Sequence, residues 1–174
     1  MKKIALGIIV IAIMIPIYLY LQKAFDKTSN FKEYSNLQYG FSFKYPKDYK
    51  FEETSLKTGQ FVWEVNIQST DMLKGDNVRD LQNIAVSVRT KSGLSFDDWI
   101  KKECNPINIT DITVSGLPAK KFECVVGNES NNKWVEIAID KGNYMYTLSD
   151  IGFNKNSYQE GIFNQIVSTY KISN

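Results

Sequence analysis

The chain has 174 residues, of which 21 are Lys or Arg and 19 are Asp or Glu, so its formal net charge is only +2. Because no basic stripe is present, we do not expect it to bind nucleic acid. It contains no histidine, so the usual general base near neutral pH and the usual zinc ligand are both missing, and we expect neither an enzyme nor a bound cofactor.

The N-terminal run Ile4–Leu21 is uncharged and almost wholly aliphatic. A helix that crosses a bilayer needs about 20 apolar residues, so this run is long enough to span. A cleaved signal peptide has a shorter apolar region and a small-x-small cleavage site, and Gln22 stands where the nearest such site needs a small residue. We therefore expect residues 1–23 to be a retained single-pass membrane anchor or an uncleaved signal.

Basic residues decide the expected orientation of this anchor. Lys2 and Lys3 lie on its short N-terminal side, and short basic flanks tend to remain in the cytoplasm. We expect a cytoplasmic N-terminus in the cell membrane, a polar tether over residues 24–33, and one extracytoplasmic domain over residues 34–174. A domain of this length can bury a core of its own.

Apolar and polar residues alternate along several segments of the domain, as is typical of half-buried strands. In the first half, Pro46 ends one such segment, and Thr70–Gln82 is polar enough to be a long loop. The predicted strands of this half are Phe41–Tyr45, Tyr49–Glu53, Phe61–Ser69 and Ile84–Val88.

A helix is predicted over Ser95–Cys104. Ser95 suits the N-cap, and the adjacent carboxylates Asp97 and Asp98 suit the positive first turn of a helix. Four more strands and an amphipathic helix follow: Ile107–Val114, Ala119–Val126, Trp134–Asp140, Tyr144–Ser149 and the helix Ser157–Tyr170. Short turns between successive strands favour antiparallel pairing. The expected fold is therefore α+β, an antiparallel β-sheet flanked by helices.

Several of these segments resemble the PsbP-like family. They are the opening Tyr39–Tyr49 (YGFSFKYPKDY), the mid-chain helix with Trp99, the hairpin Val114–Ala119 and the closing helix before Tyr170–Ile172. The resemblance extends over Tyr34–Ile172. It implies a PsbP-like α/β/α sandwich that works as a non-catalytic assembly or binding module. A metal role that depends on histidines does not carry over to this chain.

Cys104 and Cys124 are the only cysteines. In an oxidising compartment they are expected to form a disulfide, which would close a loop of about 20 residues and stabilise the fold by about 3 kcal/mol. Two buried free thiols are the alternative. A catalytic thiol is disfavoured because no histidine is present to activate it.

Other candidate sites each have a structural alternative. Tyr144, Tyr146 and Tyr158 are candidates for an aromatic ligand groove or for ordinary core positions. Asp71, Asp76 and Asp80 form a weak calcium candidate in an oxygen-rich loop, although a solvated loop is preferred and no metal is expected. The tripeptides that begin at Asn108 and Asn128 fit the glycosylation pattern. Asp97 and Asp98 do not share a helix face, which favours a capping role over acid–base catalysis.

The resulting hypothesis is a non-catalytic, membrane-anchored, extracytoplasmic binding or complex-assembly module with a protein partner at the membrane surface. One alternative is a small-ligand or lipid carrier, which needs an apolar cavity between sheet and helix. A less favoured alternative is a carboxylate-based hydrolase, which needs two carboxylates that converge in a cleft.

Overall fold

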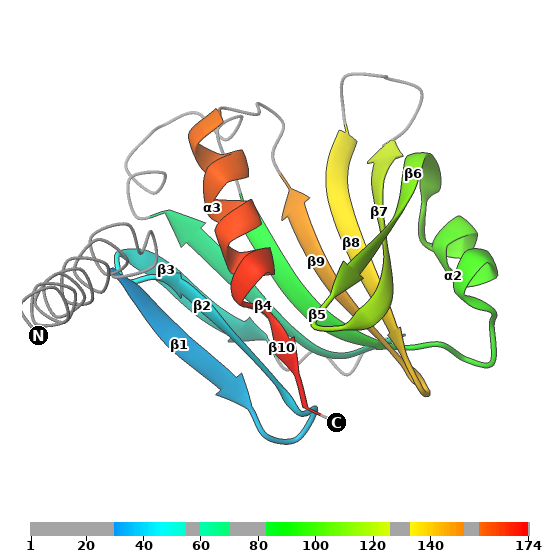
Figure 1. Ribbon diagram of the computed structural model, residues 1–174, viewed down its shortest axis with the longest axis horizontal. Coiled ribbons are helices and arrows are strands. Elements are labelled where there is room, and N and C mark those ends of the chain that lie inside the picture. Colours follow the sequence, from blue (N-terminus) through cyan, green and yellow to red (C-terminus); the bar gives the residue numbers. More distant parts are fainter. Residues whose placement is uncertain (1–29, 55–59, 70–82, 126–132, 152–156, 174) are drawn as a thin grey trace, which may run out of the picture.

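The computed structural model describes residues 30–54, 60–69, 83–125, 133–151 and 157–173. Ten strands and two helices lie within these ranges (Figure 1). In chain order they are β1 Phe31–Asn36, β2 Phe41–Pro46, β3 Tyr49–Thr54, β4 Phe61–Ser69, β5 Asn83–Thr90, α2 Phe96–Glu103, β6 Asn105–Val114, β7 Leu117–Val125, β8 Lys133–Lys141, β9 Tyr144–Ile151, α3 Ser157–Thr169 and β10 Lys171–Ile172.

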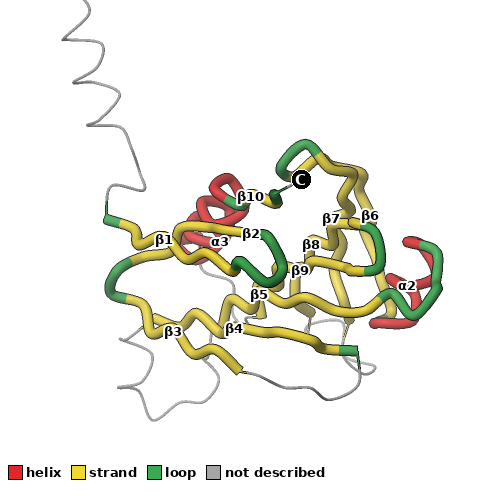
Figure 2. The backbone as a smooth tube through the Cα atoms, turned by 90° about the horizontal axis from the view of Figure 1, so that it is seen from below, coloured by secondary structure: helices red, strands yellow, loops and turns green. Residues whose placement is uncertain are grey.

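The strands form two antiparallel sheets. The large sheet has seven strands in the order β3-β4-β5-β9-β8-β7-β6, and the small sheet has three in the order β1-β2-β10. The small sheet and α3 lie together on one side of the large sheet (Figure 2). The expected antiparallel strands with two helices are therefore confirmed, but the strands divide between two sheets rather than one.

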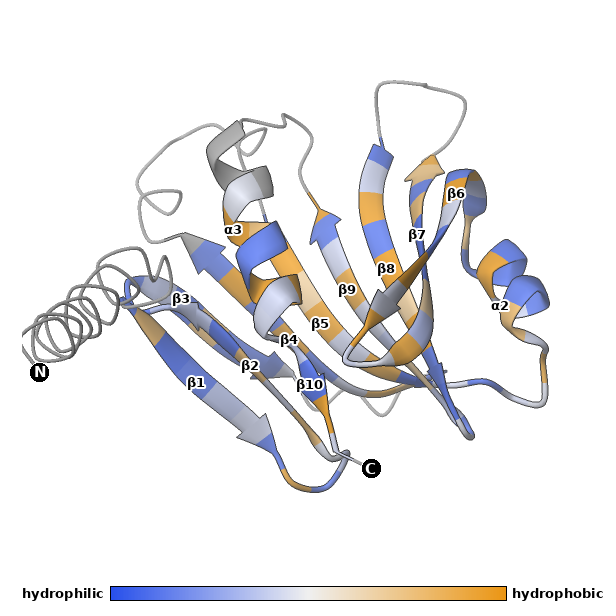
Figure 3. Cartoon of the chain, viewed as in Figure 1, coloured by the Kyte–Doolittle hydropathy of each residue, from blue (hydrophilic) through white to orange (hydrophobic). Residues whose placement is uncertain are grey.

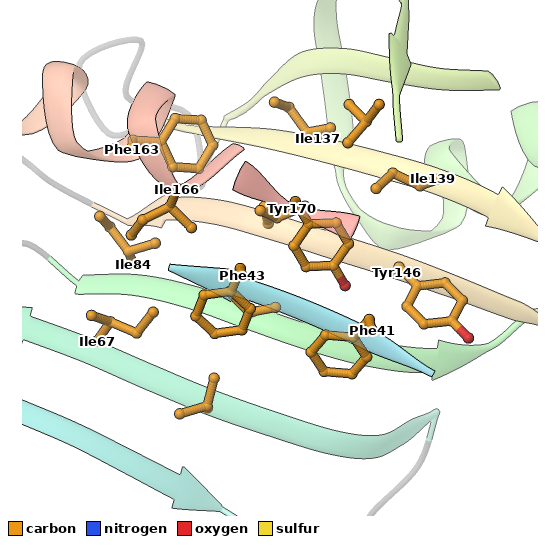
Figure 4. Close-up of a cluster of buried hydrophobic side chains, with 14 of the residues drawn as sticks. Phe41, Phe43, Ile67, Ile84, Ile137, Ile139, Tyr146, Phe163, Ile166 and Tyr170 are labelled. Atoms are coloured by element: carbon orange, nitrogen blue, oxygen red, sulfur yellow. The ribbon is translucent and has the colours of Figure 1, made fainter. Parts of the chain in front are cut away.

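The main core lies between the large sheet on one side and α3 with the small sheet on the other (Figure 4). Successive side chains of a strand point to opposite faces of the sheet, and the middle of β8 and of β9 is buried on both faces. Hydrophobic residues make up much of the middle of β8 (Figure 3). Ile84, Val86 and Leu148 supply the sheet side of this core, and Phe163 and Ile166 supply the helix side; all five are buried.

A second, smaller cluster lies on the opposite face of the large sheet, under α2. Trp99 and Ile100 on α2 are fully buried against sheet residues that include Phe122 and Met145. The hydroxyl of Ser95 accepts a hydrogen bond from the backbone N–H of Asp98 at 3.2 Å, which confirms the predicted N-cap.

The predicted tether and the first and last strands of the domain need correction. β1 begins at Phe31 and pairs with β2 along its whole length, so residues 31–33 of the predicted tether belong to the folded domain. Pro46 is the last residue of β2 and lies opposite Phe31. The charges Lys32 and Glu33 hide the strand pattern of β1, and β10 has only two residues, which is too short for any period to show.

The predicted anchor Ile4–Leu21 lies outside the described residues. Within the described ranges, neither helix is long and apolar enough to span a bilayer.

Candidate interaction surface

Large apolar side chains are exposed at two places in the described part of the chain. Leu37 and Tyr144 are 95% and 37% exposed and lie in neighbouring turns, whereas Ile107 and Ile109, 39% and 49% exposed, lie on β6. We call the first place the loop surface. It consists of the β1–β2 turn (37–40), the β5–α2 loop (91–95), the β8–β9 turn with its flanks (141–144) and Ser173, along the lower side of Figure 1.

The β1–β2 turn holds Leu37 at its tip. The side chain of Asn36 accepts a hydrogen bond from the backbone N–H of Tyr39 at 3.1 Å. Gly40 has φ +64°, a conformation that glycine adopts without strain, and its carbonyl accepts a hydrogen bond from Ser173 N–H at 2.7 Å. The turn is thus fixed at both ends, and Leu37 projects from a rigid base.

The β8–β9 turn is fixed by its neighbour, the β5–α2 loop. The backbone N–H of Lys91 donates to the carbonyl of Asn143 at 3.0 Å. The Lys91 ammonium also forms an ion pair with Asp140 at 2.9 Å, and both side chains are largely shielded from solvent. Two connections that are far apart in sequence therefore behave as one unit.

Tyr39 joins the turns to each other. Its ring packs edge-on against Tyr144, with 5.9 Å between the ring centroids, and its hydroxyl donates to the carbonyl of Val62 at 3.3 Å. The carbonyl of Tyr39 accepts a hydrogen bond from the buried hydroxyl of Tyr146 at 2.8 Å. Burial raises the pKa of Tyr146, so this hydroxyl remains a donor throughout the physiological range.

Shallow depressions lie on both sides of the β8–β9 turn. One of about 460 Å³ is lined by residues that include Leu94, Asn143 and Tyr144. The other, of about 500 Å³, is lined by residues that include Leu37 and Tyr39. Tyr, Ser, Gly and Asn predominate in both linings, a composition that suits adaptable protein recognition. Open depressions on either side of a rigid turn fit a protein surface better than a small ligand, which is usually enclosed.

A different site lies at the α2 face of the large sheet, where charged groups are buried. Arg89 forms an ion pair with Glu103, and their side chains are 11% and 16% exposed. The Arg89 guanidinium lies over the ring of Phe61, 4.3 Å from its centroid, and 5.7 Å from that of Trp99. The flat cation is thus held between two aromatic rings and a carboxylate, an environment that suits arginine.

Glu136 lies in the same region and is only 2% exposed. One of its oxygens accepts hydrogen bonds from Trp134 Nε1 at 3.1 Å and from the Ser149 hydroxyl at 3.2 Å. Burial raises its pKa, against the opposing field of Arg89. Its other oxygen has no partner among the described residues. A carboxyl group this deeply enclosed affects the stability of the fold, but a substrate cannot reach it.

The predicted cysteine pair is confirmed. Cys104 and Cys124 form a disulfide with a Cα–Cα distance of 5.6 Å, which ties the end of α2 to β7. The paired carboxylates behave as helix-start residues: Asp98 accepts a hydrogen bond from the Ser95 hydroxyl at 2.6 Å, and Asp97 lies 3.5 Å from the Lys120 ammonium.

The three tyrosines of the predicted groove lie in different surroundings. Tyr144 lines the depression described above, whereas Tyr146 is buried in the main core and packs edge-on against Phe41. The backbone of Tyr158 lies in the first turn of α3, and its side chain lies outside the described part of the structure. The space between α3 and the sheet is filled by core side chains such as Phe163 and Ile166, which leaves the carrier hypothesis without support.

Four of the remaining candidate residues lie outside the described residues, namely Asp71, Asp76, Asp80 and Asn128. Asn108 is exposed on β6. Within the described ranges, no three acidic, Cys or His side chains gather in the way that a metal site requires.

Sequence reasoning missed the residues that carry both sites. Leu37 follows an asparagine just before the predicted strand Phe41–Tyr45, and one exposed leucine produces no periodic signal. Arg89 directly follows the predicted strand Ile84–Val88, and a single charge at the end of a strand gives no sign that it is buried. An apolar residue within an Asn-x-x-x-Gly turn would have been the available signal for Leu37.

A family model described as PsbP-like protein matches residues 4–172, whereas no curated protein matches the sequence. Among solved structures, the chain is similar to that of cyanobacterial PsbP (CyanoP) from Synechocystis sp. PCC 6803, with 13% identity, a TM-score of 0.57, and coverage of 86% of this chain and 96% of that one. It is also similar to a crystal structure from Bacteroides thetaiotaomicron VPI-5482, with 12% identity and a TM-score of 0.50. That alignment covers 83% of this chain but 49% of the other, and at these identities both likenesses show the fold alone.

Proposed function

Because the chain belongs to the PsbP-like protein family, we propose that it is a non-catalytic binding or assembly module that holds a protein partner on its loop surface. The observation that carries this proposal is Leu37, which is 95% exposed at the tip of a turn fixed by hydrogen bonds at both ends. Holding an exposed leucine rigidly in water gains nothing for the fold, whereas a partner that covers it recovers about 1.5–3 kcal/mol of burial energy.

The chemistry of the domain supports binding rather than catalysis. The sequence has no histidine, and Glu136, the most deeply buried carboxyl of the α2 face, is enclosed. The loop surface instead combines an apolar tip, a tyrosine pair and turns rich in Gly and Asn, and this combination is typical of protein recognition surfaces.

The position of the surface fits a membrane-anchored module. β1 begins at Phe31 and runs about 17 Å from there to Asn36, so the loop surface lies at the opposite end of β1 from Phe31 (Figure 1). We propose that Ile4–Leu21 crosses the membrane, with a cytoplasmic N-terminus and an extracytoplasmic domain. The Cys104–Cys124 disulfide supports an oxidising compartment. Protease added outside intact cells should digest the domain and spare an N-terminal tag.

Site-specific crosslinking in native membranes tests the binding proposal. A photoreactive amino acid at position 37 should capture one stoichiometric protein partner that mass spectrometry can identify. The same group at Lys50, whose side chain is 44% exposed on β3, is the matched control and should not capture that partner. Recovery of a small molecule in place of a protein, or equal capture from both positions, would overturn the proposal.

A further inference from the structure

β6 differs from the other three edge strands of the two sheets. Edge strands are normally protected by shortness or by charge. β10 has two residues, β1 carries two charged residues in six, and β3 carries three in six. β6 is ten residues long, carries the single charge of Asp111, and is exposed over most of its length. It is therefore the least protected edge in the described structure.

The hairpin that joins β6 to β7 shows which backbone groups of β6 point outward. Ser115 and Gly116 both have positive φ, +55° and +78°, as a two-residue type I′ turn requires. Such a turn is closed by a hydrogen-bonded pair, here Val114 with Leu117. Because the two kinds of pair alternate along an antiparallel ladder, Asp111 and Thr113 occupy non-hydrogen-bonded sites. Their N–H and C=O groups therefore point away from β7.

Pairing along this edge is confined to its C-terminal half. Pro106 lacks an N–H, the register shifts between Ile107 and Thr110, and Asn108 has φ +54°. These features disrupt the N-terminal half of the strand, whereas 110–114 is regular and continues to the turn.

The regular half is self-complementary. In an antiparallel pair of two β6 strands, the outward backbone N–H and C=O groups of Asp111 in one copy can face those of Thr113 in the other. The outward groups of Thr113 in the first copy then face those of Asp111 in the second. This register puts Ile112 on the two-fold axis and uses both outward residues of each copy. A register centred on Asp111 would instead bring two carboxylates directly opposite each other, which is destabilising. The charge pattern thus favours the register centred on Ile112 over the one centred on Asp111.

We propose that β6 pairs with β6 of a second copy of this chain, in the register centred on Ile112, to give a two-fold dimer with a continuous sheet. Two-fold pairs of identical surfaces are the commonest form of oligomer. Four backbone hydrogen bonds and the Ile112–Ile112 contact form the centre of the interface, and the exposed Ile109 lies near its margin. This inference does not depend on the loop surface.

Cysteine crosslinking of the full chain in its native membrane tests the register. At a non-hydrogen-bonded antiparallel pair the Cα atoms lie about 4.5 Å apart, within the range of a disulfide. Mild oxidation of the Ile112→Cys variant should therefore give a covalent dimer on a non-reducing gel. In the same register, two copies of Ile109 lie about 20 Å apart along the strands. Ile109→Cys, although at a more exposed position, should give no dimer.

A second variant tests the backbone pairing itself. Thr113→Pro removes one outward N–H, which β7 does not use, so the monomer fold is retained and the Ile112→Cys crosslink is lost. Mass analysis should show that the Cys104–Cys124 disulfide is intact in every variant. Equal crosslinking of the two cysteine variants would indicate random collision and overturn the proposal. Absence of a dimer, or a crosslink to a different protein, would overturn it as well.

Discussion

The Tyr146 hydroxyl donates a hydrogen bond to the carbonyl of Tyr39 at 2.8 Å, which joins the central strand β9 to the β1–β2 turn. In the same core the buried hydroxyl of Tyr170 has no partner among the described residues, and burial raises its pKa well above the ordinary value. The hydroxyls of these two buried tyrosines therefore differ in whether they have an acceptor.

This difference predicts opposite effects of the same substitution. Tyr146→Phe should destabilise the domain by about 1 kcal/mol, because the Tyr39 carbonyl loses its donor. Tyr170→Phe should be neutral or stabilise by up to about 1 kcal/mol, because it removes an unsatisfied hydroxyl. Urea unfolding of the full chain in mild detergent measures both variants. Equal destabilisation by the two substitutions would contradict the conclusion that the Tyr146 hydroxyl has an acceptor and the Tyr170 hydroxyl has none.

Glu136 predicts a pH dependence of stability. Its pKa is raised in the folded state by burial, while Arg89 and Glu103 act on it with opposite signs. The neutral form therefore favours folding, and this contribution is complete below the unfolded-state pKa and is lost as the pH rises through the folded-state pKa. Compared with Glu136→Gln, the natural chain should lose stability over that interval by up to about 1.4 kcal/mol per pH unit.

Unfolding of both chains between about pH 4 and pH 8 gives the comparison. A constant difference in the free energy of unfolding across that range would show that Glu136 does not titrate as its burial requires.

The Arg89–Glu103 pair predicts a strong non-additivity. Arg89→Met should cost about 3–5 kcal/mol, because it leaves Glu103 buried without its cation. The double variant Arg89→Met with Glu103→Leu should recover most of this loss, because no unpaired charge remains. A double-mutant cycle by denaturant unfolding measures the coupling energy. If the losses of stability from the two single substitutions added up in the double variant, the Arg89–Glu103 pair would be effectively solvated.

The disulfide predicts a dependence on reducing agent. Replacing Cys104 and Cys124 together by Ala should lower the free energy of unfolding by about 3 kcal/mol, mainly because the unfolded chain gains freedom. The same loss should follow when a dithiol reductant is added to the natural chain. Near-UV circular dichroism of Trp99 and its neighbours reports whether the α2 cluster remains packed. If the double alanine variant were as stable as the natural chain, the disulfide would not contribute to the free energy of unfolding.

Regular periodicity allowed most of the fold to be predicted from the sequence. β4 has the bounds that alternation predicted, Phe61–Ser69, and α2 begins after the predicted cap, Ser95. The division into two sheets could not be predicted, because β2 pairs with β1 and the two-residue β10 rather than with the next strand, β3, and neither partner shows a strand pattern in the sequence.

The interaction surface was harder to predict for a similar reason. The exposure of Leu37 depends on how the chain folds around Asn36 and Gly40. At the α2 face, the burial of Arg89 likewise depends on Phe61 of β4 and Trp99 of α2. Tertiary contacts, rather than local patterns, set both environments.

The small sheet unites the two ends of the domain. Its middle strand, β2, pairs with β1 on one side and β10 on the other, and the backbone N–H of Lys44 donates to Thr169, a contact that spans 125 residues. A nascent chain that has not yet synthesised residues 169–173 therefore leaves one side of β2 unpaired and Phe41 and Phe43 without Tyr170. Such an intermediate exposes apolar surface that favours association, and we expect the small sheet to close only after residues 169–173 have been synthesised.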